Sequence, residues 1–330
     1  MLARRMKFQI EDLEIGSTPM LIPSLSSRAN IDINQSLEVI REIVKGPLLL
    51  SLYDVFYASP NLKEISFPDL IFLDSGGYEC AKDCVVTEYG FYRPDPQIWN
   101  YNFYLAAMEK WKQIQKDQEQ IPTIIVSYDH PLEKMPIQVQ ITKAKETFDT
   151  QENVLKEILI KPENSDNLNI DLIIENLKYL TEFYLIGFTE KDLGNSISER
   201  MKNIIKIRIA MEKIGQKLPI HIFGSLDPVT TPLYYFSGAD VFDGLSWLNF
   251  IFYNGEMMYR DSLGPKMFGI NEDIDGIWIK TLVNNYDYLT KMKIDLERFH
   301  SSRDFNIFKN NADFFKTTIE TINGEIGGII

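Results

Sequence analysis

The sequence is poor in cysteine and histidine and has no long apolar run. Its two cysteines, Cys80 and Cys84, are too few for a disulfide framework or a structural zinc site, so we expect reduced thiols and neither a metal nor another cofactor. No stretch approaches the roughly 18 uninterrupted apolar residues of a membrane span, and no apolar segment follows the N-terminal arginines as in a secretory signal. We therefore expect a cytoplasmic protein without membrane contact.

Basic residues are scarce relative to acidic ones. The 34 Lys and Arg against 47 Asp and Glu give a formal net charge of −13 at pH 7. This charge opposes nonspecific attraction to a polyanion, so a contact with nucleic acid must come from a local patch. Lys202, Lys206, Arg208 and Lys213 are candidates for a phosphate-binding patch on one helix, with an ordinary solvated helix face as the alternative.

Short apolar runs alternate with longer amphipathic stretches through most of the 330 residues. Each run is apolar at both odd and even positions, which is typical of a parallel strand buried on both faces. Eight such units favour a TIM (β/α)₈ barrel, an α/β fold, over an open doubly wound sheet. The runs occupy residues 19–25, 47–54, 70–76, 122–129, 157–162, 183–188, 219–225 and 239–245.

Helical periodicity fills the intervals between the runs and then dominates the C-terminal part. Ser196 and Glu199 form a capping-box pattern at the start of one expected helix, which closes at Gly215. From about residue 262 the pattern changes to helical segments rich in Asn, Asp, Lys and Phe. We therefore predict a barrel domain over residues 1–261 and a helical C-terminal cap over residues 262–330.

The stretch IFLDSGGYE, residues 71–79, places a carboxylate at the end of an expected strand and two glycines after it. Gly76 and Gly77 remove side chains where Asp74 emerges, which leaves room for a flat ligand. The alternative is a simple junction between a strand and a turn, in which Asp74 caps the next segment.

Two other expected strands also end in an aspartate. Asp74 ends the third run, Asp129 the fourth and Asp243 the eighth, while Gly187 stands near the end of the sixth. The C-terminal ends of all strands share one rim of a barrel, and this rim is where active sites of the fold are built. The pattern therefore predicts one site that combines these acids, with unrelated loop caps as the alternative.

These residues resemble the signature segments of the tRNA-guanine transglycosylase superfamily, which includes the queuine and archaeosine tRNA-ribosyltransferases. LDSGGYE is similar to the family's segment of Asp-Ser-Gly-Gly and an aromatic residue, and further similar segments follow the family order across about residues 15 to 255. The resemblance implies a barrel that exchanges a guanine base in nucleic acid for a 7-deazaguanine. The other segments are GSTPMLIPSLSSRANI, VSYDHP, LIGFTE, HIFGSLDP and GADVFDGLSW.

The resemblance implies a role for each matching acid. Base exchange with retention needs a carboxylate that attacks C1′ and holds a covalent intermediate, and Asp243 matches that nucleophile. Asp74 matches the general acid/base that moves a proton between the leaving and the entering base. Asp129 matches the carboxylate that accepts from the N1–H and 2-amino groups of guanine.

The remaining matches imply substrate contacts. Gly187 would donate its backbone N–H to O6 of the base, and Tyr78 would stack on the base. Ser75 and Gly76, in the same signature, are further candidate substrate contacts. The implied partners are nucleic acid, either DNA or tRNA, and a free guanine or 7-deazaguanine base.

The chain also departs from the family pattern. The family's zinc site uses three cysteines and a histidine C-terminal to the barrel, where this chain has only His300. The family's base-contacting glutamine after the fifth strand has no clear match here, and Lys161 or Glu163 stands nearby. We expect His130 to line the site and His221 to be a packing residue.

The substrate and the outcome of the reaction stay open. LSWLNFIFYNGE, residues 245–256, replaces the Pro-Thr-Arg run with which bacterial tRNA enzymes hold RNA, and FDGLSW is more similar to the branch of archaeal enzymes and DNA-modifying relatives. A hydrolytic glycosylase that removes a base is one alternative function. A non-catalytic partner subunit that binds nucleic acid or free base is another, and a homodimer is also open.

Overall fold

A computed structural model gives the structure of the chain. It describes residues 2–10, 13–29, 31–58, 65–80, 99–116, 121–130, 133–151, 155–164 and 166–328. Cys80 is a free, buried thiol, and Cys84 lies outside the described residues.

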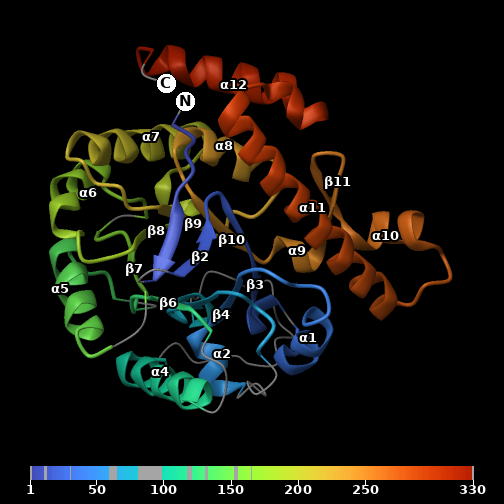
Figure 1. Cartoon of the computed structure of the whole chain (residues 1–330), viewed down its shortest axis with the longest axis horizontal. Helices are drawn as coiled ribbons and strands as arrows, with labels where there is room; N and C mark the ends of the chain where they lie inside the picture. The colour runs from blue at the N-terminus through green and yellow to red at the C-terminus, as the bar shows by residue number, and fades with distance from the viewer. Residues whose placement is uncertain are drawn as a thin grey trace.

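Eight parallel strands close into a barrel that helices surround (Figure 1). The strand order is β10-β3-β4-β5-β6-β7-β8-β9, and β10 pairs with β3 to complete the ring. The predicted TIM barrel is confirmed, because each predicted run overlaps one strand. The strands are β3 (Met20–Leu25), β4 (Leu48–Ser51), β5 (Ile71–Asp74), β6 (Thr123–Val126), β7 (Leu155–Ile160), β8 (Leu185–Thr189), β9 (Ile220–Phe223) and β10 (Val241–Gly244).

Successive residues of each strand contribute to two different apolar cores. Phe72 on β5 and Ile124 on β6 belong to a core inside the barrel. The next residues, Leu73 and Ile125, belong to the core between the strands and the helices. Because side chains alternate between the faces of a strand, a polar residue in step with Phe72 also faces the barrel interior.

An antiparallel hairpin of β1 (Lys7–Ile10) and β2 (Leu13–Ser17) precedes the barrel. Its residues Phe8 and Ile15 are buried and join the inner core together with Met20, at the start of β3. The sequence analysis did not predict this hairpin. It covers the N-terminal end of the barrel, opposite to the rim where the site is expected.

Four helices of the barrel, α1 (Ile33–Ile40), α2 (Leu52–Tyr57), α6 (Ile170–Asn176) and α7 (Ile197–Lys213), begin at a polar cap whose side chain accepts from a backbone N–H. Before α7, the Ser196 hydroxyl accepts from the Glu199 N–H, as the predicted capping box requires, whereas the Glu199 carboxylate accepts from the N–H of Asn195, one residue before the cap. No helix in the described part of the chain is long and apolar enough to cross a membrane. The other barrel helices are α3 (Gly77–Cys80), α4 (Tyr101–Lys116), α5 (Ile137–Phe148) and α8 (Thr230–Ser237).

After β10 the chain continues mainly as helices, which confirms the predicted C-terminal extension. Phe236 on α8 lies 4.5 Å from Phe299 and 5.6 Å from Phe315, measured between ring centroids, so the extension shares an aromatic core with the barrel helices. A division into two domains at residue 261 stays a prediction. The elements are α9 (Ser246–Asn249), β11 (Phe250–Tyr253), β12 (Glu256–Tyr259), α10 (Arg260–Phe268), α11 (Ile274–Ser302), the 3₁₀ helix η5 (Phe305–Asn311) and α12 (Ala312–Glu325).

A buried ion cluster lies at the N-terminal end of the barrel. Arg208 on α7 is fully buried and forms an ion pair with Asp240, the residue before β10. Arg4 also donates to Asp240, at 2.9 Å. Lys202 on the same helix pairs with Glu325 on α12. Arg208 therefore cannot belong to the phosphate patch considered above, because its guanidinium is inaccessible.

Candidate active site

Side chains alternate between the two faces of each strand, and this alternation directs several polar residues into the C-terminal half of the barrel. Asp74 on β5 is in step with Phe72, and Asp243 on β10 is in step with Val241, which are both inner-core residues. Gly187 on β8 pairs in register with His221 on β9. The predicted catalytic acids thus occupy the same rim, and both are buried.

The Asp243 carboxylate is held by groups from two neighbouring strands. One oxygen, Oδ2, accepts from the Ser24 hydroxyl on β3 at 2.7 Å. The other, Oδ1, accepts from the Gly224 N–H at 3.1 Å and lies 3.3 Å from Nε2 of His221. These contacts fix the carboxylate at the rim.

His221 is an ion-pair residue, which corrects the expectation that it packs without a partner. Its Nδ1 lies 2.8 Å from Oε1 of Glu157 on β7, and both side chains are fully buried. Burial alone would lower the pKa of His221, but the charges of Glu157 and Asp243 outweigh burial and raise this pKa to about 9. The imidazole is therefore a cation at neutral pH.

Gly187 is required by its neighbours inside the barrel. A Cβ atom at this position would lie 2.5 Å from the Phe223 ring and 2.8 Å from Oε1 of Glu157. The Phe223 ring in turn stacks on His221 with 3.9 Å between centroids. A side chain at Gly187 would therefore displace the pair of Glu157 and His221.

Asp74 lies among other carboxylates. Burial raises its pKa well above the usual value, and the charges of Glu79, Asp129 and Asp243 raise it further. Both the environment and the position thus favour a protonated acid beside Asp243.

The glycines after Asp74 make room for this chain's own side chains. Gly76 has φ of +86°, and a Cβ there would lie 2.7 Å from the Trp99 ring. A Cβ on Gly77 would lie 2.5 Å from the Asp129 carboxylate, which also accepts from the Ser75 hydroxyl. The pair of glycines therefore seats Trp99 and Asp129, a reason that the sequence analysis did not consider.

Tyr78 is about half exposed, at 46 %, beside the rim. The Arg28 guanidinium lies 4.3 Å from the centroid of its ring, a cation–π distance. The next residue, Glu79, is buried and accepts from the hydroxyls of Ser26 at 2.5 Å and Ser51 at 2.8 Å. The Arg28 guanidinium thus covers one face of the Tyr78 ring, and the residue after Tyr78 is fixed by two hydroxyl groups.

Asp54 on α2 is a further buried acid that the sequence analysis missed. It accepts from the Ser27 N–H at 2.9 Å, and its Oδ1 has no hydrogen-bond partner within the described residues. Burial, followed by the charge of Glu79, raises the pKa of Asp54 to about 8. The rim therefore holds more carboxylates than the strand ends alone indicated.

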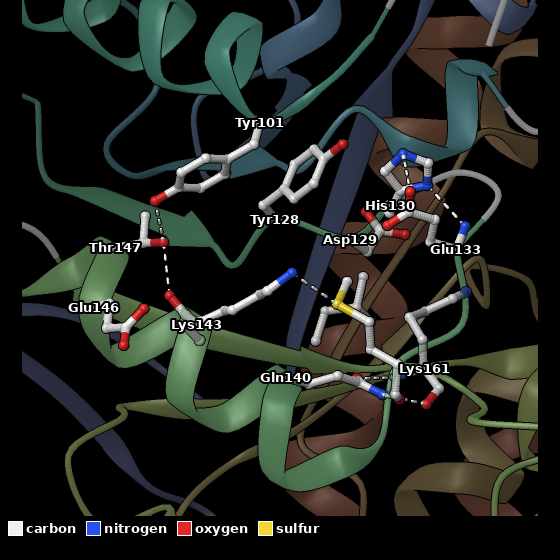
Figure 2. Close-up of a pocket in the computed structure, with 13 residues that line it drawn as sticks. Tyr101, Tyr128, Asp129, His130, Glu133, Gln140, Lys143, Glu146, Thr147 and Lys161 are labelled. Carbon is white, nitrogen blue, oxygen red and sulfur yellow. Dashed lines mark hydrogen bonds and ion pairs between the residues drawn. The ribbon is translucent and has the colours of Figure 1, made fainter. Parts of the chain in front are cut away.

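A pocket of about 230 Å³ opens beside Asp129 (Figure 2). Tyr101 and Tyr128 line one side, and residues of α5 such as Lys143 line the other. Asp129 and His130 both line the pocket, as expected for His130. Asp74, Asp243, Gly187 and Tyr78 lie outside its lining, so the pocket adjoins the two catalytic candidates instead of containing them.

Lys161 is one of two lysines that line this pocket, and Glu163 is not part of its lining. The Lys161 ammonium donates to Asp192 at 2.7 Å and to Thr189 at 2.9 Å. Glu163 instead accepts from the Ile137 N–H at the start of α5. Of the two residues considered near the family's glutamine position, Lys161 therefore faces the candidate site and Glu163 caps a helix.

The residues present do not fit the zinc site of the transglycosylases. His300 lies with its Nδ1 3.2 Å from the carbonyl oxygen of Ala3, a structural contact. Among the residues that the structure describes, no group of three or more His, Cys, Asp or Glu side chains could hold a metal ion.

The sequence matches no protein-family model and no curated protein. The resemblance to the transglycosylases therefore depends on the short sequence motifs alone.

Proposed function

We propose that the chain is a guanine transglycosylase, which exchanges a guanine in DNA or tRNA for a 7-deazaguanine through a covalent intermediate on Asp243. One observation carries the proposal: a carboxylate fixed by donors, Asp243, lies on the same barrel rim as an acid of raised pKa, Asp74. A nucleophile and a proton donor in separate environments are the two groups that this exchange requires.

The reaction uses each group twice. Asp243 attacks C1′ while the bond from C1′ to N9 of guanine breaks, and the leaving guanine takes a proton from Asp74. The entering base then gives its N9 proton to Asp74 and attacks C1′, and the ester bond returns its electron pair to Asp243. Asp74 ends protonated, as its raised pKa favours.

Base recognition would use the groups around Asp129. Its carboxylate can accept from the paired N1–H and 2-amino donors of guanine. An ammonium carries three N–H donors, and Lys161 uses two of them on Asp192 and Thr189, so the third can serve the O6 acceptor. Tyr78 offers an aromatic face that Arg28 supports from one side.

The test is to trap the intermediate. The protein is incubated with tRNA or DNA and a guanine analogue, and a protein–nucleic acid adduct that survives SDS is sought, because noncovalent contacts do not survive denaturation. Asp243→Asn should abolish the adduct and keep base binding. Asp166→Asn, an exposed acid in the loop after β7, should leave the adduct unchanged. An adduct that persists in Asp243→Asn contradicts the proposed nucleophile.

The same reaction mixtures separate the alternatives. Incorporation of a labelled 7-deazaguanine supports exchange. Loss of guanine without incorporation indicates a hydrolytic glycosylase. Binding of nucleic acid or base without either reaction indicates a partner subunit.

A further inference from the structure

A chain of three charged side chains crosses the barrel interior. Glu157 on β7 lies 2.8 Å from Nδ1 of His221 on β9, and Nε2 of His221 lies 3.3 Å from Asp243 on β10. The imidazole therefore stands between two carboxylates that come from different strands. Only the outer end of this chain, Asp243, reaches the rim.

The surroundings of the imidazole are otherwise apolar. The Phe223 ring stacks on it, and the Phe72 ring meets it edge-on with 5.6 Å between centroids. The charged groups that face His221 are Glu157 and Asp243. An ion pair placed in such a core costs desolvation energy, and packing alone does not call for it.

The hydrogen bonding along these three side chains is incomplete, although Nδ1 of His221 forms a hydrogen bond with Oε1 of Glu157. Within the described residues, Oε2 of Glu157 and Nε2 of His221 have no hydrogen-bond partner. The distance from Nε2 to Asp243 is that of an ion pair without hydrogen-bond geometry. A buried polar atom left in this way is costly and needs an explanation.

We propose that His221, held by Glu157, is a positioning residue that places a positive charge against Asp243 and drives the release of the sugar in the second half of the exchange. This inference rests on the proposed function, because it assigns a partner to the proposed nucleophile.

The two oxygens of Asp243 then differ in role. Oδ1 faces His221 and the Gly224 N–H, whereas Oδ2 accepts from the Ser24 hydroxyl and from no other group among the described residues. Attack by Oδ2 forms the bond to C1′ and breaks the bond from C1′ to N9, which leaves Oδ1 as the carbonyl oxygen of a neutral ester. When the entering base attacks C1′, the electron pair of the ester bond returns to the carboxylate beside the imidazolium.

The charge of His221 therefore favours the free carboxylate over the ester. Close charge pairs in buried sites are strongly coupled, so loss of this cation should raise the fraction of enzyme present as the covalent adduct by about ten-fold. A merely structural role predicts the opposite, because a damaged site forms less adduct.

The first experiment measures the adduct fraction at equilibrium in the parent protein and in His221→Gln, with thermal unfolding as the check on folding. The glutamine keeps a donor and removes the charge. Glu157→Gln, which deprives the imidazole of its anionic partner, should shift the fraction in the same direction by less. An unchanged or smaller adduct fraction in the folded variants overturns the proposal.

The second experiment needs no substrate and so separates this inference from the proposed function. The chain has three histidines, so ¹⁵N-histidine NMR can be assigned with single variants. His221 should give an imidazolium signature at pH 7 and titrate near pH 9. Asp243→Asn should lower that midpoint, because it removes one of the two facing negative charges, and Asp166→Asn should not. A neutral His221 at pH 7, or a midpoint that Asp243→Asn leaves unchanged, overturns the proposal whether or not an adduct forms.

Discussion

The two ends of the barrel hold buried charges in opposite arrangements. At the N-terminal end, two guanidinium groups, Arg208 and Arg4, surround the single carboxylate of Asp240, which also accepts from the Ile220 N–H at 2.8 Å. At the C-terminal rim, the carboxylates of Asp74, Asp243 and their neighbours outnumber the cations among the described residues. The same fold thus contains one compensated cluster and one in which like charges are held together.

The difference indicates that the cluster at the N-terminal end stabilises the fold, whereas the acidic rim at the C-terminal end has the features of a functional site. Each charge in the compensated cluster has partners, so the cluster resembles an ordinary buried ion pair that fixes α7 to the barrel. At the acidic rim, burial and then the charges of neighbouring carboxylates raise the pKa values of Asp74 and Asp54, and Oδ1 of Asp54 has no hydrogen-bond partner in the described chain. Perturbed acids that cluster at a rim are typical of a site that performs chemistry at some expense of stability.

The largest effect is expected at the compensated end. Arg208→Met leaves Asp240 buried with one guanidinium fewer and should lower the free energy of unfolding by about 3–5 kcal/mol, as measured by urea denaturation. Lys202→Met is the matched control, because it breaks an exposed ion pair of the same helix and should cost about 0–1 kcal/mol. Equal losses in the two variants would show that the buried cluster has no special role.

The fold could be predicted from the sequence because the signal was repeated. Each parallel strand is buried on both faces and so appears as an apolar run, and eight runs with helical intervals fit a barrel. The hairpin of β1 and β2 was missed because its segment, KFQIEDLEIGS, mixes charged and apolar residues and has no run of its own. Its burial depends on tertiary contacts with the open end of the barrel.

The candidate site was predictable only at the ends of the strands. Asp74, Asp129 and Asp243 follow apolar runs and were found there, but Glu157 and His221 lie within runs and were read as strand residues. The alternation of side chains along each strand would have identified them. Glu157 is two residues from both Leu155 and Leu159, and His221 is two residues from Phe223, and these three apolar residues belong to the inner core. That the two side chains meet depends on the register between β7, β8 and β9, which no local pattern encodes.

A smaller effect is expected for base binding at the acidic rim. Asp129→Ala leaves the donor edge of guanine unpaired and should weaken binding of guanine or a 7-deazaguanine by about 1–3 kcal/mol in calorimetry. Asp166→Asn, which alters an exposed acid outside the lining of the pocket, should change binding little. A variant Asp129→Ala that binds the base as tightly as the parent contradicts the role of Asp129.

The acidic rim should also show in the pH dependence of stability. The pKa of Asp54 is about 8 in the folded chain, against about 3.9 in an unfolded one, so the folded state binds more protons between these values. Its contribution to stability is present below about pH 4 and is lost as the pH rises through 8. Asp54→Asn should therefore flatten the stability profile from pH 5 to 8, by at most about 1.4 kcal/mol per pH unit.

Urea denaturation of the parent protein and Asp54→Asn at several pH values measures this change. Asp166→Asn serves as the control with an exposed carboxylate, and its slope should equal that of the parent. Because Glu79 also has a raised pKa, part of the slope should remain in Asp54→Asn. A profile as steep as that of the parent would place the protonated acid elsewhere in the rim.

The smallest change in stability at low pH is expected at Asp74, although its loss should stop the exchange reaction. An asparagine resembles a protonated aspartic acid, and burial, followed by the charges of Glu79, Asp129 and Asp243, makes the folded state favour the protonated form. Asp74→Asn should therefore match the parent in unfolding free energy at about pH 4, near the ordinary pKa of an aspartate. As the pH rises, the parent should lose stability relative to Asp74→Asn by at most about 1.4 kcal/mol per pH unit, because its unfolded state ionises while its folded state keeps the proton. Urea denaturation at low and at neutral pH checks this, and a marked loss of stability in Asp74→Asn at low pH would mean that the carboxylate of Asp74 supports the fold and is not held there as the acid of the reaction.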